Sequence, residues 1–305
     1  MYRFYLPFLV FLVMTSSLVA GEFQFKDGDR VALVGSTLIE REQKYGYWEL
    51  AITTRHPNKN IIFRNLGWSG DTVWGESRVG FDLDNPQKGF ERLRDAVLAV
   101  KPTVIIVGYG TNESFAGEAG LPRFKEGLNK LLDAFAPTKA RIVLLAPLAF
   151  ETHERMIPDP TRPNHNISIY SQAIAETAKQ RDCYFVDIFA AKSRKDAGCL
   201  TSDGMQLTEY GYRYSGELLM RYLCLDRPLR TIPNPDNKLT PEKEKLRQAI
   251  IEKNQLYFHR YRPQNETYLF GFRKYEQGNN AVEVPQFDAL IEAKEKEIAK
   301  LLIHE

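Results

Sequence analysis

The stretch Val31-Ala32-Leu33-Val34-Gly35-Ser36-Thr37-Leu38-Ile39-Glu40 decides the fold of this chain. Its apolar run stops at Gly35, and two small hydroxyl residues and a charged, helix-compatible segment follow. A short apolar run that ends in glycine is typical of a strand buried on both faces. A strand, a tight turn and a helix open an α/β sheet, in which ligands bind at the carboxyl ends of the strands. We therefore expect Ser36 and Thr37 to lie at the functional edge of the sheet.

Apolar runs and helical patterns alternate from this stretch to about residue 226. Further strands are predicted at 60–66, 103–108, 141–145 and 183–187. Helices are predicted at about 40–56, 90–100, 122–136, 166–181 and 208–224. Strands that alternate with helices imply right-handed crossovers, and hence a parallel, doubly wound α/β sheet.

The two ends of the chain differ in composition from this central domain, which we assign to residues 22–226. Residues 1–21 have the layout of a secretory signal peptide, with Arg3, an apolar run over 5–14 and small residues up to Gly21. The apolar run is short for a membrane span, which needs about 20 residues, although an uncleaved anchor is the alternative. In either case we expect the protein to be exported, to the periplasm or the extracellular space, with no membrane contact after cleavage.

Residues 227–305 read as a proline-punctuated linker followed by a helical extension. Helices are predicted at about 240–261 and 286–302, on either side of an aromatic-rich stretch over 262–284. The extension has too few apolar residues for a sizeable core of its own, so we expect it to pack on the α/β domain. The aromatic stretch is either an irregular linker or a lip over the functional edge.

Composition and charge exclude several classes of function. The net charge of +2 is too small to indicate a polyanionic partner, so no nucleic acid is expected. The three cysteines, Cys183, Cys199 and Cys224, allow at most one bridge. No Cys-x-x-Cys, His-Glu-x-x-His or haem-attachment motif occurs, so we expect neither a metal nor another cofactor.

Four loops follow the predicted strands or lie at the same edge: 35–37, 69–72, 110–113 and 203–206. Together they resemble the four blocks of the SGNH hydrolases, the GDSL-type esterases and lipases, over about residues 27–225. The resemblance implies a flavodoxin-like three-layer sandwich with a five-stranded parallel sheet. The segment from Tyr257 to Asn280 is similar to one that follows SGNH-like domains in secreted proteins of planctomycete-type bacteria.

The resemblance carries over residue by residue. It makes Gly70 the backbone donor and Asn112 the side-chain donor of an oxyanion hole, and Asp203 the carboxylate that orients the base. Thr37 occupies the position of the nucleophilic Ser, and Gln206 that of the catalytic His. A threonine hydroxyl can attack an ester, but an amide does not take up a proton near neutral pH.

A different base could replace the missing imidazole. His153 and His165 flank the long loop after the fourth strand, and either one is a candidate, with ordinary surface histidines as the alternative. Ser36 is either a displaced nucleophile or a hydroxyl that stabilises the turn.

Other side chains of these loops are candidates for substrate contact. Trp68 and Tyr109 would stack on sugar rings if exposed and would belong to the core if buried. Asp71 and Glu113 would bind substrate or form part of an acidic cluster, or would be solvated or helix-capping carboxylates.

These residues favour an exported esterase that removes acyl groups, most simply acetyl, from carbohydrate or another small ester. The alternative is an inactive relative that binds a glycan or a protein partner in the same cleft. The oxyanion residues favour the first hypothesis, and Thr37 and Gln206 favour the second.

Overall fold

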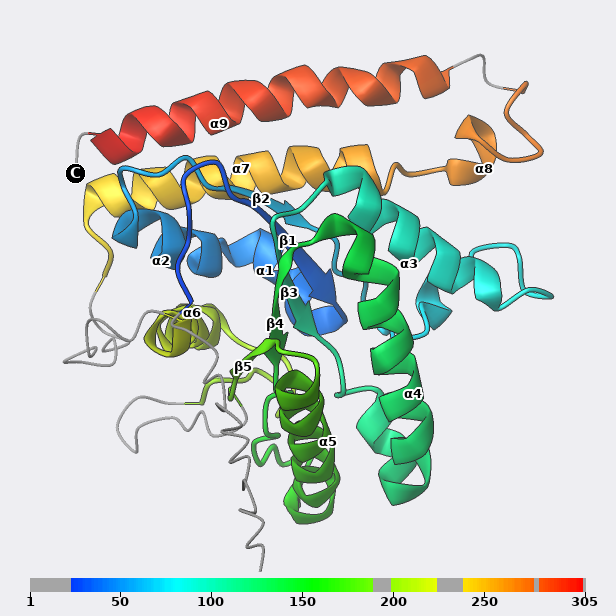
Figure 1. Ribbon diagram of the computed structural model, residues 1–305. Helices are drawn as coiled ribbons and strands as arrows, with labels where there is room; N and C mark the ends of the chain where they lie inside the picture. The colour runs from blue at the N-terminus through cyan, green and yellow to red at the C-terminus, as the bar shows by residue number, and fades with distance from the viewer. Residues whose placement is uncertain (1–22, 189–198, 224–237, 277–279, 304–305) are drawn as a thin grey trace, which may run out of the picture.

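The computed structural model describes residues 23–188, 199–223, 238–276 and 280–303. Its sheet has five parallel strands in the order β2-β1-β3-β4-β5 (Figure 1). The strands are β1 (Arg30–Gly35), β2 (Ile62–Asn65), β3 (Val104–Gly108), β4 (Arg141–Leu145) and β5 (Tyr184–Val186). The predicted five-stranded parallel sheet is thereby confirmed.

Helices cover both faces of this sheet and one of its edges. The α-helices are α1 (Thr37–Tyr45), α2 (Tyr47–Arg55), α3 (Gln87–Val100), α4 (Gly117–Phe135), α5 (Thr161–Gln180), α6 (Glu209–Leu223), α7 (Pro241–Tyr261), α8 (Glu266–Leu269) and α9 (Phe287–Ile303). Short 3₁₀ helices are η1 (Glu76–Arg78), η2 (Glu113–Ala116), η3 (Ala136–Thr138) and η4 (Asn280–Gln286).

Strand β1 shows why the sheet is buried on both faces. Val31 and Leu33 belong to a core cluster with residues of α1, α2 and α6, whereas Ala32 and Val34 belong to a second cluster with residues of α3, α4 and α5. Because successive strand residues point to opposite faces, an uninterrupted apolar run serves both cores at once. The three-layer α/β sandwich is therefore confirmed.

The single helix predicted over 40–56 is two helices, α1 and α2, which meet at Gly46. Gly46 has a left-handed backbone (φ 67°), and its N–H donates to the carbonyl oxygen of Glu42 at 2.8 Å, which ends α1. The Glu42 carboxylate then accepts from the backbone N–H of Trp48 at 2.7 Å, near the start of α2. The apolar spacing alone did not reveal this break, because both helices bury residues on the same side of the sheet.

The C-terminal extension forms a helical hairpin. Helices α7 and α9 lie side by side, and α7 also contacts α1, α2 and the edge strand β2 (Figure 1). Lys253 of α7 is buried and donates to both carboxylate oxygens of Glu49 in α2, at 2.7 and 2.6 Å. The predicted helical extension is thus present, and it shields β2, which would otherwise be an open edge.

Two predictions fall on residues outside the described ranges, namely the signal peptide over 1–21 and most of the linker after 226. Cys183 and Cys199 are both free thiols. Within the ranges described, no helix combines the length and apolar character needed to cross a membrane.

Candidate active site

Thr37 lies where β1 passes into α1, at the carboxyl edge of the sheet. The preceding Ser36 starts the helix, since its carbonyl oxygen accepts from the backbone N–H groups of Ile39 and Glu40, both at 3.0 Å. The Thr37 hydroxyl oxygen accepts a hydrogen bond from the backbone N–H of Gly70 at 3.2 Å. Gly70 has φ +76°, a conformation that side chains disfavour. The first two loops therefore meet with an N–H donor beside the Thr37 hydroxyl.

Asn112 follows β3 and lies against the same second loop. Its Nδ2 donates to the backbone carbonyl oxygen of Asp71, the residue after Gly70, at 2.7 Å. A carboxamide nitrogen carries two hydrogens, and within the described part of the chain the second one makes no hydrogen bond. That second N–H is available to a ligand.

Asp203 and Gln206 share one tight turn. Oδ1 of Asp203 accepts from the backbone N–H groups of Met205 at 2.9 Å and of Gln206 at 2.7 Å. The turn is closed by a bridge between Thr201 and Leu207. The Asp203 carboxylate consequently lies within one hydrogen bond of the residue in the base position.

A small cavity of about 80 Å³ joins these elements. Thr37, Asn112 and Gln206 all line it, and so does Ser36, whereas Gly70 and Asp203 reach it only through their hydrogen-bonded neighbours. The other lining residues are Leu38, Arg41, Thr111, Phe115, Leu148, Phe150, Met205, Leu207 and Tyr212. The structure thus assembles one crevice from loops that lie far apart in the sequence.

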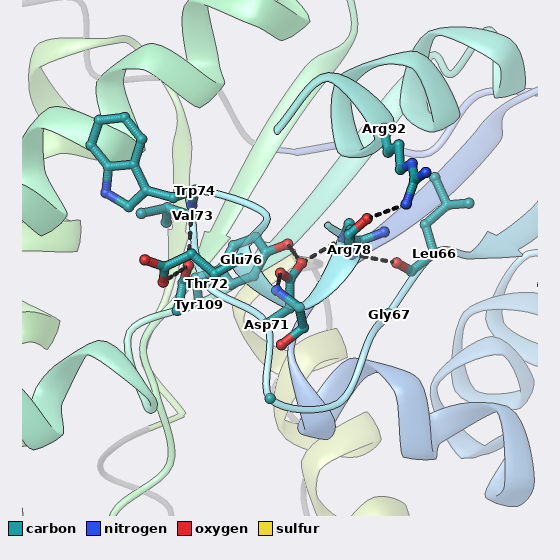
Figure 2. A network of polar contacts seen from close by, with 12 residues as sticks. Leu66, Gly67, Asp71, Thr72, Val73, Trp74, Glu76, Arg78, Arg92 and Tyr109 are labelled. Carbon is teal, nitrogen blue, oxygen red and sulfur yellow. Dashed lines mark hydrogen bonds and ion pairs between the residues drawn. The ribbon is translucent and has the colours of Figure 1, made fainter. Parts of the chain in front are cut away.

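Figure 2 shows the buried polar network around Asp71, which corrects two of the expected substrate contacts. Asp71 Oδ2 accepts from Arg78 Nε at 2.6 Å and from the Tyr109 hydroxyl at 2.9 Å, and Arg78 Nη2 donates to the Leu66 carbonyl oxygen at 2.9 Å. Asp71 and Tyr109 are 0% and 2% exposed. Burial, with the neighbouring Asp71 carboxylate, raises the pKa of Tyr109 well above its ordinary value. Both side chains hold the second loop in shape and do not contact the cavity.

Glu113 also supports the loops and does not line the cavity. Its two carboxylate oxygens accept from the backbone N–H groups of Val73 and Gly110, both at 2.9 Å. Burial raises the pKa of this carboxyl to about 7. Because both oxygens already have main-chain donors, Glu113 links the loop after β3 to the second loop, and the expected substrate contact is corrected.

Residues 30–214 match the model of the GDSL-like lipase/acylhydrolase family. The chain belongs to this family. A relative, the GDSL esterase/lipase WDL1 of Oryza sativa subsp. japonica, is 25% identical over 211 residues, which are 63% of this chain and 76% of the relative. The resemblance to the SGNH hydrolases that the four loops carry is thus confirmed.

Solved structures share the family's fold. A catalytic mutant of Axe2, an acetylxylan esterase from Geobacillus stearothermophilus, matches with a TM-score of 0.51 and 18% identity over 66% of this chain and 96% of its own. BT4096, a gut microbial diltiazem-metabolizing enzyme, matches with a TM-score of 0.59 and 14% identity over 92% of this chain and 95% of its own. The second likeness covers so much of the chain that it extends into the helical extension.

Among the residues that the structure describes, no histidine lines the cavity. His153 Nδ1 accepts from the backbone N–H of Met156 at 3.3 Å, and His165 Nε2 lies 3.8 Å from a carboxylate oxygen of Glu118 with its side chain 65% exposed. Neither imidazole hydrogen-bonds to Thr37. The structure therefore does not support either histidine as the replacement base.

Trp68 contacts the C-terminal extension and does not line the cavity. The guanidinium of Arg262 lies 3.6 Å from the centroid of the Trp68 ring and donates to Glu40 Oε2 at 2.7 Å. The same Glu40 oxygen accepts from the backbone N–H of Ser69 at 2.5 Å. The expected stacking of Trp68 on sugar is corrected, since its ring ties the extension to the loop that carries Gly70.

Sequence reasoning missed several residues of the cavity. Arg41 follows Thr37 by four residues in α1, and helical spacing could have placed both on one face. Phe115 is an aromatic residue of the loop after β3, where the sequence predicts that an exposed ring could stack on a sugar, and it is 64% exposed. Its stacking on Phe150, with ring centroids 5.9 Å apart, joins loops after two different strands, and the sequence offers no local signal for this pairing.

The acidic side chains of the loops have separate hydrogen-bond partners. Glu40 pairs with Arg262, Asp71 with Arg78, and Glu113 with main-chain N–H groups. Among the side chains that the structure describes, no group of His, Cys, Asp and Glu is arranged to hold a metal ion.

Proposed function

We propose that this protein is an exported ester hydrolase of low turnover that removes small acyl groups, most simply acetyl, from carbohydrate. The observation that carries the proposal is that Thr37 and Asn112 line one cavity, with the Gly70 N–H beside it in a hydrogen bond to the Thr37 hydroxyl oxygen. An ester carbonyl bound there would face a hydroxyl nucleophile and two N–H donors, which is the arrangement that acyl transfer needs.

The size of the cavity supports a short acyl group. Its volume of about 80 Å³ is well below the roughly 300–1,000 Å³ of pockets that take drug-sized ligands. The exposed ring of Phe115, which lines the same cavity, offers an apolar face on which a sugar ring could stack. Acetylxylan esterases with the same fold support acetylated carbohydrate as the substrate class.

The reaction would proceed through Thr37. Its Oγ1 forms a bond to the ester carbonyl carbon while its proton passes to a water molecule, because the Gln206 amide cannot accept it. The oxyanion receives hydrogen bonds from Gly70 and Asn112, the alcohol leaves with a proton, and a second water hydrolyses the acyl-enzyme. Without general-base help the rate would be about 10²–10⁴-fold below that of a complete triad.

The second candidate function is binding of an acylated glycan without turnover. Gln206 favours it, since an amide in the base position can donate and accept hydrogen bonds but cannot activate the Thr37 hydroxyl. Export under either function rests on the composition of residues 1–21. Neither candidate involves nucleic acid.

Hydrolysis of p-nitrophenyl acetate tests the proposal. The native protein is compared with Thr37→Ala and Asn112→Ala, and with Asn58→Ala as an exposed control remote from the cavity. A tenfold or larger drop in kcat/KM in the first two variants alone, about 1.4 kcal/mol of transition-state binding, supports catalysis. Rates equal to buffer for all four proteins refute the hydrolase and leave binding.

A further inference from the structure

Arg41 gives the cavity a positive charge that the family's reaction does not use. It lies one helical turn after Thr37 in α1, and both side chains line the same cavity. None of the cavity-lining residues in the described ranges is acidic. The guanidinium is therefore the one charged group at the cavity wall in this part of the chain.

The hydrogen-bond partners of Arg41 are neutral hydroxyl groups. Its Nε is buried without a partner, Nη2 donates a long bond of 3.4 Å to the Tyr45 hydroxyl, and the guanidinium also interacts with the Tyr212 hydroxyl. Tyr212, whose ring also lines the cavity, donates its hydroxyl to the Leu38 carbonyl oxygen at 2.8 Å. A guanidinium has five N–H donors and keeps its charge at any physiological pH.

The acidic neighbours of Arg41 in the sequence form no ion pair with it. Glu40 pairs with Arg262. Glu42 is buried, its Oε1 accepts from the backbone N–H of Trp48, its Oε2 has no hydrogen-bond partner among the described residues, and burial raises its pKa well above the ordinary value. Buried Arg247, in contrast, has a carboxylate partner in Glu244 at 2.7 Å. No ion pair to Arg41 is present among the residues that the structure describes.

A partly buried charge without a counter-ion is unfavourable until an anion enters. We propose that Arg41 forms a carboxylate-binding subsite in the cavity. This rests on the proposed function and narrows it: the carboxylate belongs either to the acid released by ester cleavage or to a uronic acid in the substrate. A planar guanidinium matches a carboxylate with two parallel hydrogen bonds, which a neutral sugar cannot reproduce.

Calorimetric titration tests the subsite without any turnover. Sodium acetate, sodium D-glucuronate and glucose are titrated into the full chain at constant ionic strength, with Arg41→Gln compared with the exposed-site control Arg94→Gln on α3. At least one carboxylate should bind the native protein and the control equally, and bind Arg41→Gln at least tenfold more weakly. Binding of acetate alone identifies the product as the source, and binding of glucuronate over glucose identifies the substrate.

Arg41→Lys keeps the positive charge but lacks the planar guanidinium, so it should bind the carboxylate with intermediate affinity. It also provides a second test if Arg41→Gln does not fold. Two results would overturn the subsite: neither carboxylate binds the native protein, or affinity is the same within twofold in every Arg41 variant that folds. If p-nitrophenyl acetate is not hydrolysed but carboxylate binding depends on Arg41, the hydrolase proposal fails and the subsite stands.

Discussion

Replacing Gln206 with histidine should convert this site into a faster esterase. The Gln206 side chain lines the cavity together with Thr37, and the Asp203 carboxylate already accepts from the backbone N–H of residue 206 at 2.7 Å. An imidazole there would stand between a nucleophile and an orienting carboxylate, the order that a catalytic triad requires. General-base catalysis contributes about 10²–10⁴-fold, which equals ~2.7–5.4 kcal/mol at 1.36 kcal/mol for each factor of ten.

We expect the gain from Gln206→His to lie near the lower limit, because the methyl group of Thr37 restricts its rotamer. Combining it with Thr37→Ser should bring a further increase. The assay is kcat/KM for p-nitrophenyl acetate between pH 5.5 and 8.5. The new rate should rise with pH as the imidazole loses its proton, around its ordinary pKa of about 6.5.

Two controls separate this gain from hydrolysis by the imidazole alone. Gln172→His puts the same group on the exposed side of α5, away from the cavity, and should change nothing. Adding Thr37→Ala to Gln206→His should abolish the increase. The reasoning is refuted if the folded Gln206→His protein gains less than threefold, or if the gain survives the loss of the Thr37 hydroxyl.

Two other side chains allow tests of what supports the site. Arg262→Gln removes the guanidinium from the Trp68 ring and should lower the free energy of unfolding, measured by urea denaturation, by about 1–2 kcal/mol. It should also lower esterase activity, because the loop that carries Gly70 loses this support. The control variant Arg260→Gln should keep its activity, and equal activity in the two variants would contradict the prediction. Burial raises the pKa of Glu113 from 4.5 to about 7, so the folded state binds this proton more tightly than the unfolded state. This contribution to stability is complete below pH 4.5 and is lost as pH rises through 7. Between pH 5 and 8 the free energy of unfolding of the native protein should therefore fall by roughly 2–3 kcal/mol relative to that of Glu113→Gln. Parallel stability curves for the two proteins would refute this prediction.

The sheet and the four loops could be predicted because their signals are local. Each central strand is an apolar run bounded by glycine or proline, as in 104–108, and a parallel sheet brings the ends of such runs to one edge. Gly70 and Asn112 lie in the loops that follow β2 and β3, so the strand order brings these loops to the edge where Thr37 lies. The roles of Gly70 and Asn112 as donors were implied by the resemblance to the SGNH hydrolases.

The roles of the loop side chains could not be predicted, because they depend on partners far away in the sequence. Aspartate and tyrosine side chains bind sugars in many proteins. Asp71 and Tyr109 instead support the loop, because Asp71 accepts from both Arg78 and Tyr109 in a buried network. Trp68 likewise depends on Arg262, 194 positions later, whose contact exists only once α7 has packed on α1 and β2. A single sequence does not say which of several arginines a carboxylate or an indole will meet.

The hydrogen-bond partners of the loop side chains also indicate whether the cavity binds a ligand. Groups that hold the loops, such as Asp71 and Glu113, have their hydrogen bonds satisfied within the protein. The donors at the cavity itself, the second N–H of Asn112 and the guanidinium of Arg41, do not. An unpaired donor at a half-buried surface weakens the folded state unless a ligand accepts its hydrogen bond. Because both of these donors lie at one crevice beside the Thr37 hydroxyl, a ligand rich in oxygen acceptors would satisfy them together, and this holds whether or not the ligand is then hydrolysed.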